Sequence, residues 1–475
     1  MANKAQTKTK MMKNDHIILG SSFRDPSGFM FREKNTLYRQ INRSYKENYS
    51  LLKNSGLYDE LTENGLLIEH IEIETSCGDS ECYKHIKPAA VPFISYPYEW
   101  TFSQLKDAAL ATLEIQKIAM KHGMTLKDAS AFNIQFIEGK PLLIDTLSFE
   151  KYEKKKPWVA YRQFCQHFLA PLALMSCKDI RLIQLFRVFI DGIPLDLASS
   201  LLPKSTYANI SLFMHIHAHA KTQKRFASKQ INRRTSHLSE HAMQGLISSL
   251  INAIKKLHWK KTNTEWDKYY SFTNYSDSAF KKKKKIIEEF IDVLPKTPAL
   301  VWDLGGNTGL FSRIASNKEI NTISFDIDYL AVEKNYREMR EKKEKHILPL
   351  FLDLTNPSTN LGWAHQERES LEKRGPADLI MALALIHHLS ISNNVPIGMI
   401  ASYFSLLCKY LIVEFIPKDD SNVQKLLSTR KDIFIKYNQK NFEKSFNEYF
   451  DITSSQNIEG SKRVLYLMIS RHIHE

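Results

Sequence analysis

Two kinds of apolar pattern alternate along the second half of the chain: short continuous runs, and stretches with an apolar residue at every third or fourth position. Five short apolar runs have the length of buried strands, at 299–305, 320–328, 346–354, 377–385 and 410–418. Three intervening stretches repeat apolar residues every three or four positions, as amphipathic helices do, at 309–317, 330–345 and 399–409. This order predicts an α/β fold with a parallel, doubly wound sheet and helices on both faces. Two final runs, 450–460 and 461–471, are split by a Gly-Ser turn and predict an antiparallel hairpin at the end of the sheet.

The first half has a different pattern, and a chain of 475 residues is too long for one compact core. Helical periodicity is clear at 103–123 and 158–175, and a short hairpin is expected within 20–41. Residues 221–241 are polar and basic, as a linker is, and a further amphipathic helix covers 243–259. We therefore expect three parts, with the bounds 1–235, 236–265 for the linker and helix, and 266–475.

The net charge of +14 would suit an anionic partner such as RNA. Much of the excess lies in the lysine-rich tracts 151–156 and 281–285, which are typical of solvated faces. Tyr152 is the one aromatic residue within these tracts and no known RNA-binding motif is found, so nucleic acid is a possible partner but not the favoured one.

Potential metal ligands are present but lack the spacing of a metal site. Cys77 and Cys82 are not followed by a second ligand pair, and free thiols are expected there. The histidines at 215, 217 and 219 are expected at a solvated helix end. No signal peptide and no run of membrane-spanning length is found, so we expect no metal, no membrane span and a cytoplasmic protein.

The sequence "VWDLGGNTG" (301–309) places glycines directly after the first predicted strand. Gly305 and Gly309 permit a tight turn, but the spacing is neither G-x-G-x-x-G nor a Walker P-loop, which disfavours a pyrophosphate. Asp326 ends the second strand, where a carboxylate can accept both hydroxyls of a ribose. Asp353 ends the third strand, in position to accept from an adenine amino group, and Asp303 lies at the base of the turn. A nucleoside cofactor without phosphates is therefore predicted.

These motifs carry a resemblance to a known family. "VWDLGGNTG", "SFDID", "LFLDLT" and "ADLIMALALIHHL" resemble the first four motifs of class I S-adenosylmethionine-dependent methyltransferases, with Asn307 replacing the middle glycine of the usual loop. The resemblance covers residues 266–475 and implies a Rossmann-like sheet and S-adenosyl-L-methionine as cofactor. The implied cofactor-binding residues are Asp303, Gly305, Gly306, Asn307, Gly309, Asp326 and Asp353.

Methyl transfer requires alignment of the nucleophile with the donor and little obligatory acid-base chemistry. The candidate catalytic residues are His387 and His388, either of which could orient or deprotonate the acceptor, although both could instead be structural. Tyr269, Tyr270 and Tyr275 are candidates for a lid or for a packing helix. The motif "NPPY" of amino-methylating DNA and glutamine enzymes is absent, which argues against those substrates.

A second resemblance lies in the first half. Asp128, Asn133 and Asp145 follow the D-x-x-x-x-N and strand-borne Asp pattern of the protein-kinase and aminoglycoside-kinase superfamily. The implied domain is α+β, with a small N-lobe at about 15–95 and a helical C-lobe at about 96–220. The family's histidine before Asp128 is replaced, no good glycine-rich loop is present, and Arg39 is the nearest candidate for the strand lysine. The resemblance is therefore to a degenerate kinase-like domain.

The two-part arrangement also resembles a group of bacterial methyltransferase-like proteins that includes host-specific nodulation proteins. The leading hypothesis is a methyltransferase whose N-terminal domain recognises the substrate or a partner. One alternative is a bifunctional kinase and methyltransferase that also binds Mg-ATP, and another is a non-catalytic scaffold that binds S-adenosylmethionine. The acceptor, whether small molecule, protein or RNA, stays open.

Overall fold

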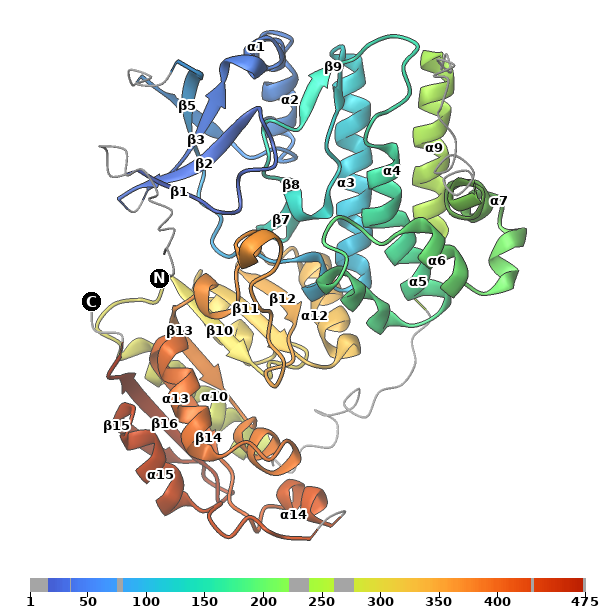
Figure 1. Cartoon of the computed structure of the whole chain (residues 1–475). Coiled ribbons are helices and arrows are strands. Elements are labelled where there is room, and N and C mark those ends of the chain that lie inside the picture. The colour runs from blue at the N-terminus through green and yellow to red at the C-terminus, as the bar shows by residue number, and fades with distance from the viewer. Residues whose placement is uncertain are drawn as a thin grey trace, which may run out of the picture.

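The computed structural model describes residues 16–34, 36–74, 80–221, 239–259, 277–428 and 431–472. The C-terminal part is built on a seven-stranded sheet with the order β12-β11-β10-β13-β14-β16-β15 (Figure 1). Its strands are β10 (Leu300–Leu304), β11 (Asn321–Asp326), β12 (Ile347–Phe351), β13 (Ala377–Ala382), β14 (Cys408–Phe415), β15 (Phe450–Asn457) and β16 (Val464–Ser470). All seven lie where the apolar runs predict strands.

The first five of these strands are parallel, and β16 pairs antiparallel with both β14 and β15. In register, Asp303 of β10 lies beside Ser324 of β11 and Met381 of β13. The chain order reverses between β10 and β13, so the carboxyl ends of these two strands form the switch point at which doubly wound sheets bind ligands.

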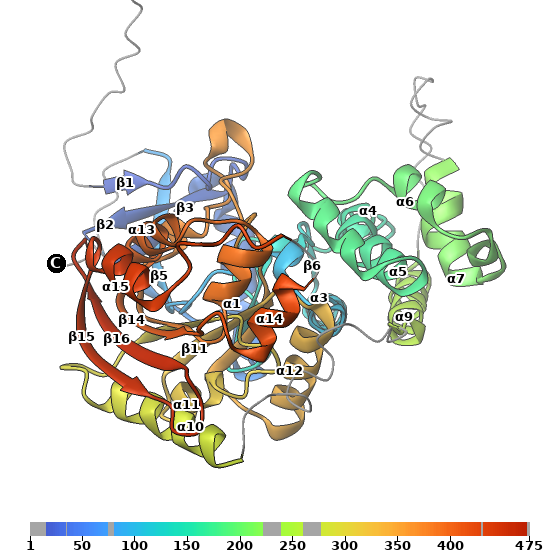
Figure 2. The same cartoon turned by 90° about the horizontal axis from the view of Figure 1, so that it is seen from below.

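Helices cover both faces of this sheet, as predicted. On one face α10 (Asp277–Asp292) and α11 (Ser312–Ser316) pack on the apolar side chains of alternate strand residues such as Val301 and Met381. On the other face α12 (Tyr329–Lys342), α13 (Ile397–Leu407) and α15 (Gln439–Asn447) pack on the intervening ones, such as Trp302 and Ile380. Figure 2 shows α10 along the outer face of the sheet, away from α13 and α15. Alternation of buried residues along each strand thus produces two separate cores.

The N-terminal part begins with an antiparallel five-stranded sheet of the order β1-β2-β3-β5-β4. Its strands are β1 (His16–Ile18), β2 (Gly28–Glu33), β3 (Thr36–Asn42), β4 (His70–Ile73) and β5 (Cys82–Pro88). Helices α1 (Lys46–Asn54) and α2 (Leu57–Glu63) lie between β3 and β4 in the chain. After β5 the domain is mainly helical, with two short strand pairs, β6 (Met124–Leu126) with β9 (Phe149–Lys151), and β7 (Ile134–Ile137) with β8 (Lys140–Leu143).

Helix α3 (Phe102–Lys121) is the central helix of this region. The Thr101 hydroxyl accepts a hydrogen bond from the Gln104 amide at 3.1 Å, and the Gln104 side chain accepts one from the Thr101 amide at 2.8 Å, a capping box that starts the helix. Gly123, with φ of +72°, ends it. The remaining α-helices of the described residues are α4 (Tyr161–Phe164), α5 (Ala170–Cys177), α6 (Leu195–Leu201), α7 (Ile210–Leu212), α9 (Glu240–Lys256) and α14 (Ser421–Leu427).

Of these two cores, the one on the α12 face of the sheet continues into the N-terminal part. The ring of Phe93, in the segment between β5 and α3, lies 5.7 Å from Trp302 and 5.9 Å from Phe325, both on the sheet of the C-terminal part. Asp107 of α3 accepts a 2.8 Å hydrogen bond from the Tyr336 hydroxyl of α12. Apolar residues of both parts belong to the same buried cluster, so the predicted domains pack as one body.

Three local expectations were wrong. Cys82 is disulfide-bonded, although a free thiol was expected; Cys77 lies outside the described residues. His215 and His217 are buried in the turn Phe213–Ala218 rather than solvated, because their ring nitrogens are used by internal hydroxyl groups such as that of Thr206. Lys283, within the lysine tract 281–285, is buried. Tyr269, Tyr270, Tyr275 and most of the expected linker lie outside the described residues.

Candidate cofactor site

A cavity of about 390 Å³ opens at the carboxyl ends of β10 to β13. Its wall combines apolar side chains with a few polar groups, the usual composition of a small-molecule site. All but one of the residues expected to hold the cofactor lie in this wall. The lining contains Asp303, Gly305, Gly306, Asn307, Asp326, Asp353 and His388, together with apolar residues from the neighbouring loops and helices.

The glycine turn is held close to β11. The amides of Gly305 and Gly306 both donate to the Phe325 carbonyl, at 2.9 and 2.8 Å. Gly305 (φ +79°), Asn307 (φ +49°) and Gly309 (φ +78°) adopt left-handed backbone, which asparagine tolerates better than most residues. A Cβ atom at Gly306 would lie 2.5 Å from the Ser324 hydroxyl, so this position accepts only glycine without a shift of its neighbours. Gly309 supports the turn from outside the cavity lining.

Asp326 and Asp303 lie on either side of this turn. The two oxygens of Asp326 accept hydrogen bonds from the amides of Asn307 and Asp328, both at 2.8 Å. Asp303 accepts one from the Ser312 hydroxyl at 2.6 Å, so it orders the start of α11. Burial raises the pKa of Asp326 to about 6 and that of Asp303 to about 6. Both carboxyls are therefore mostly ionised at pH 7 and become protonated as the pH falls below about 6.

Asp353 follows β12 in a tight turn. One carboxylate oxygen accepts hydrogen bonds from the Thr355 amide and hydroxyl, at 2.8 and 2.6 Å. The Leu352 amide donates to the Asp326 carbonyl at 2.9 Å, which fixes the ends of β12 and β11 side by side. Two carboxylates thus face one cavity from adjacent strand ends. This arrangement can accept hydrogen bonds from a ribose and from the exocyclic amine of a base.

The two candidate histidines are not equivalent. His388 begins the π-helical turn His388–Ser392 and lines the cavity, whereas His387 is 1% exposed and lies outside the lining. Their rings are 4.1 Å apart. Burial lowers the pKa of His388 to about 4 and also lowers that of His387, so both rings are neutral near pH 7. His388 is the one placed to take a proton from a ligand in the cavity.

Sequence analysis did not predict a buried ion pair that begins at Lys283, a lining residue of the cavity. Lys283 Nζ lies 2.7 Å from Glu414 Oε2 at the end of β14, and both side chains are at most 2% exposed. The same Glu414 oxygen accepts a 2.8 Å hydrogen bond from the Ala384 amide. Arg463 lies 3.7 Å from the other oxygen, and burial lowers the pKa of Lys283. The sequence does contain a pattern that indicates the burial of Lys283. Its position falls on the same helix face as four buried apolar residues, Ala279, Ile286, Ile287 and Phe290.

The kinase-like motif residues also come together, between β6 and β9. The Ile144 amide donates to the Asn133 carbonyl at 2.8 Å, which sets Asn133 beside Asp145. Asp128 accepts a 2.7 Å hydrogen bond from the Gln163 amide nitrogen, and burial together with the charge of Asp145 raises its pKa. A hydrogen bond from the Asn133 side chain opposes that rise, so Asn133 lies beside Asp128 as well.

Internal cations occupy the acidic side of this motif. Arg39 of β3, the nearest candidate for the strand lysine, lies 2.5 Å from Asp145. Burial opposes ionisation of Asp145, but Arg39 and the Ser148 hydroxyl hold its pKa below the usual value. Lys127 lies 3.3 Å from Asp25 and donates a hydrogen bond to a serine hydroxyl at 2.7 Å. The charges of this site are therefore largely balanced within the protein.

No cluster of three or more His, Cys, Asp or Glu side chains suited to a metal ion occurs among the described residues. Within the same residues, no helix has the length and apolar character needed to cross a bilayer.

Taken together, the strand order, the glycine turn after the first strand and the acid at the end of the second define a doubly wound α/β fold with a ligand cavity at its switch point. The chain is 32% identical over 457 residues to the nodulation protein NoeA of Rhizobium meliloti (strain 1021), a match that covers 94% of this chain and 95% of that protein. It therefore belongs to the NoeA family. No family model matches the sequence.

The solved structures that match this chain superpose on it with low TM-scores. The protein PH0226 of Pyrococcus horikoshii OT3 is 13% identical, with a TM-score of 0.31 over 44% of this chain and 100% of that one. The N-methyltransferase NodS of Bradyrhizobium japonicum WM9 is 9% identical, with a TM-score of 0.30 over 41% and 98%. The bifunctional kinase-methyltransferase WbdD is 14% identical, with a TM-score of 0.28 over 41% and 40%. Overlays this loose do not assign a function.

Proposed function

We propose that this protein is an S-adenosylmethionine-dependent methyltransferase whose N-terminal domain recognises the acceptor or a partner. The observation that carries the proposal is one cavity with a glycine turn on one wall and the carboxylates of Asp326 and Asp353 on adjacent strand ends. The pattern suits a nucleoside with an uncharged ribose, because Asp326 and Asp353 would repel a phosphate there. The absence of a Walker or dinucleotide glycine pattern points the same way.

In this proposal each group has a distinct task. Asp326 accepts the ribose hydroxyls, Asp353 accepts the adenine amine, and the turn at Gly305 and Gly306 lets the backbone approach the ligand. The cofactor supplies an electrophilic methyl group on a sulfonium. His388 is neutral at pH 7, because burial lowers its pKa to about 4, and it orients the acceptor oxygen or nitrogen or takes its proton, as a weaker base than free histidine. The apolar wall excludes water from the transfer.

Calorimetry with S-adenosylhomocysteine tests the cofactor, and Gly305→Arg is the blocking variant. A Cβ at Gly305 would lie 3.3 Å from Leu385, and φ of +79° strains any side chain there, so binding should be lost. Labelled methyl donor in a cell extract, followed by fractionation, tests turnover. Label in an acceptor supports the enzyme, whereas binding without any transfer supports a non-catalytic scaffold.

For the N-terminal domain we propose a degenerate kinase-like fold. Its support is the antiparallel sheet followed by helices, with Asp128, Asn133 and Asp145 close together on loops next to β6, β7 and β8. Because Arg39 and Ser148 already engage Asp145, magnesium would have to displace them, which favours recognition over phosphoryl transfer.

The bifunctional alternative has one observation in its favour, the pKa of Asp128, which is raised as a general base would require. Titration of the protein with Mg-ATP decides between the two roles. Binding that disappears in Asp145→Ala would support the bifunctional enzyme, and no binding by the unaltered protein would remove it.

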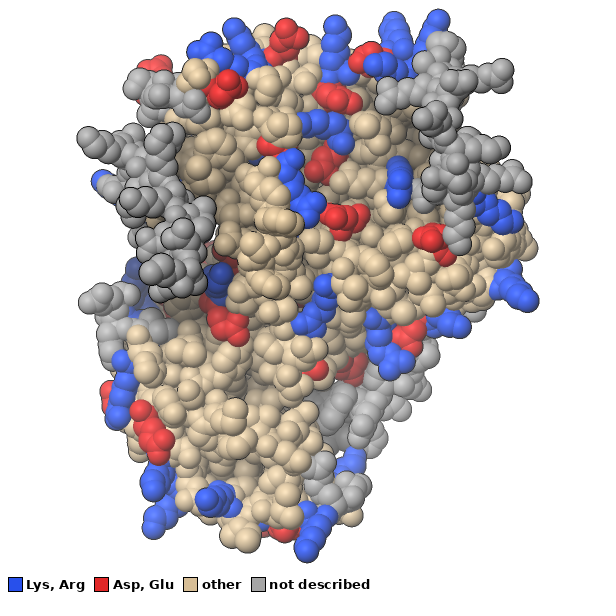
Figure 3. Space-filling view, in the orientation of Figure 1, with Lys and Arg blue, Asp and Glu red and all other residues tan. Residues whose placement is uncertain are grey.

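The acceptor is a small molecule, a protein or an RNA. On the face drawn in Figure 3, Lys and Arg side chains of the described residues are interspersed with Asp and Glu, which does not favour nucleic acid. An RNA acceptor would bind with an affinity that falls steeply as salt rises, and filter binding at several salt concentrations measures this.

A further inference from the structure

The N-terminal domain reaches the loops that carry both cofactor-site acids. One 3₁₀-helix, η5 (Ile180–Arg187), contacts both loops, although it lies far from the cavity in sequence. In a 3₁₀-helix residues three apart lie on the same face, so Gln184 and Arg187 point in one direction. Each of them binds a different acid-bearing loop.

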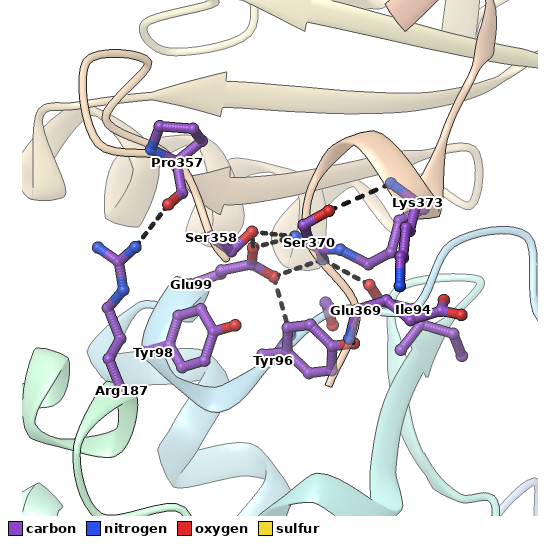
Figure 4. Close-up of polar contacts among 12 residues, drawn as sticks. Ile94, Tyr96, Tyr98, Glu99, Arg187, Pro357, Ser358, Glu369, Ser370 and Lys373 are labelled. Carbon is purple, nitrogen blue, oxygen red and sulfur yellow. Dashed lines mark hydrogen bonds and ion pairs between the residues drawn. The ribbon is translucent and has the colours of Figure 1, made fainter. Parts of the chain in front are cut away.

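Arg187 holds the segment that follows Asp353. Its guanidinium donates to the carbonyls of Asn356 at 3.3 Å and Pro357 at 2.6 Å, and it lies 5.8 Å above the Tyr98 ring (Figure 4). The Asn356 amide in turn donates to the Asp353 carbonyl at 3.0 Å, which closes the turn. Arg187 is therefore bonded to the residues that close the Asp353 turn.

A buried charged cluster fixes the next residue of that segment. The Ser358 hydroxyl donates to Glu99 at 3.2 Å and accepts from Arg374 at 2.5 Å, and Arg374 also donates to Glu99 at 2.6 and 2.9 Å. Figure 4 shows Glu99 and Ser358 facing each other between the two domains. The side chains of Glu99 and Arg374 are at most 3% exposed, so the segment is tied to the N-terminal domain at two successive points.

Gln184 supports the other loop. Its amide donates to the Tyr329 hydroxyl at 2.9 Å and to the Tyr98 carbonyl at 2.7 Å. Tyr329 is the first residue of α12, three positions after Asp326, and its ring stacks on Phe351 of β12 at 4.0 Å. The same helix η5 thus contacts the start of α12 and the segment after β12.

These loops need external support because β12 is the edge strand of the sheet. Among the described residues no further strand pairs with its open side, and the N-terminal domain packs there instead. Gln104 of α3 donates to the Pro349 carbonyl of β12 at 3.0 Å, so the coverage begins along the strand itself.

We infer that η5 of the N-terminal domain positions the adenosine-binding acids, with Gln184 and Arg187 as positioning residues for the cofactor. The inference rests on the proposed function, because it assigns Asp326 and Asp353 to the ribose and the adenine. It makes the N-terminal domain a structural part of the methyl-donor site in addition to its proposed role in recognition. Neither Gln184 nor Arg187 lines the cavity.

The test uses the full chain and calorimetry with two ligands, S-adenosylhomocysteine and S-inosylhomocysteine, which lacks the adenine amine. Arg187→Met should weaken S-adenosylhomocysteine about tenfold, since a hydrogen bond from a charged donor corresponds to roughly one decade of binding constant. The ratio of the two binding constants should also fall, because the variant displaces the Asp353 carboxylate, which accepts the adenine amine that S-inosylhomocysteine lacks. Arg340→Met is the matched control, since Arg340 makes another contact between the domains, at 2.6 Å from Asp107.

The outcomes separate the two proposals. If the unaltered protein binds neither ligand, the proposed function fails. The positioning role fails if the unaltered protein binds S-adenosylhomocysteine and Arg187→Met binds it equally well. It also fails if Arg187→Met raises the Kd of both ligands by the same factor. Ser358→Ala serves if Arg187→Met does not fold, since it leaves the direct Glu99–Arg374 bonds in place; it must shift the ligand preference in the same direction for the inference to stand.

Discussion

The carboxylate of Asp326 offers the sharpest test of the cofactor site. Each of its oxygens already accepts one backbone amide, from Asn307 and from Asp328, both at 2.8 Å. A carboxylate oxygen has two lone pairs, so each oxygen retains one for a ribose hydroxyl. Asp326→Asn removes the charge and sets an NH₂ group against one of the two amides, which also disturbs the glycine turn.

The expected loss follows from those two free lone pairs. A hydrogen bond to a charged group contributes about 1.5 kcal/mol at the lower end, and two of them correspond to a roughly hundredfold rise in Kd. Calorimetry with S-adenosylhomocysteine at pH 7.5 measures it. Asp378→Asn is the matched control, because Asp378 accepts hydrogen bonds from the amides of Ala299 and Leu300 at 2.7 and 3.0 Å, at the opposite, amino-terminal ends of the parallel strands. A Kd for Asp326→Asn within threefold of the control would refute the assignment.

Three further predictions concern charge. S-adenosylhomocysteine should stabilise the protein more at pH 7 than at pH 5, because burial raises the pKa of Asp303 and Asp326 to about 6 each and only the ionised form of Asp326 accepts hydrogen bonds from both hydroxyls. In the free protein the raised pKa values make the folded state lose stability as the pH rises from about 4 to about 6, so thermal shifts are compared with and without ligand at each pH. Lys283→Met should lower the free energy of unfolding by about 3–5 kcal/mol in denaturant titration, because the buried Glu414 loses its nearest cation and keeps only the more distant Arg463. His388→Gln should lower kcat at least about 100-fold at pH 7 while S-adenosylhomocysteine binds as before, measured by methyl transfer once the acceptor is known.

Each of these has a clear negative result. A ligand-induced shift that is the same at both pH values would show that neither carboxyl changes ionisation on binding. For the buried pair, Lys283→Met combined with Glu414→Gln should recover part of the lost stability, and a further loss would argue against charge imbalance as the cause. Turnover by His388→Gln within a few-fold of the unaltered protein would exclude the ring as the base.

Local patterns in the sequence predicted most of the C-terminal sheet and which residues meet at the carboxyl ends of its strands. Strand ends followed by Asp326 and Asp353, and glycines at 305 and 309, are signals that a few neighbouring residues encode. Which histidine faces the cavity was not predictable, because the π-helical turn at His388–Ser392 sets their orientation.

The contributions that sequence analysis missed depend on distant partners. Lys283 lies in a run of lysines, and its burial follows from a glutamate 131 positions later. Gln184 and Arg187 have no motif at all, since their role arises only when η5 packs against loops from the other half of the chain. Asn133 and Asp145 were identified by spacing, but the pairing of Asp145 with Arg39 required the assembled strands.

The packing of Phe93 against Trp302 and Phe325 has a consequence for synthesis of the chain. During translation the first half leaves the ribosome before its apolar counterpart exists, so Phe93 and its neighbours meet water or a chaperone until β10 and β11 have been made. A gene cut near residue 235 would prolong that exposure indefinitely. The two halves should then be recovered soluble only when they are expressed together.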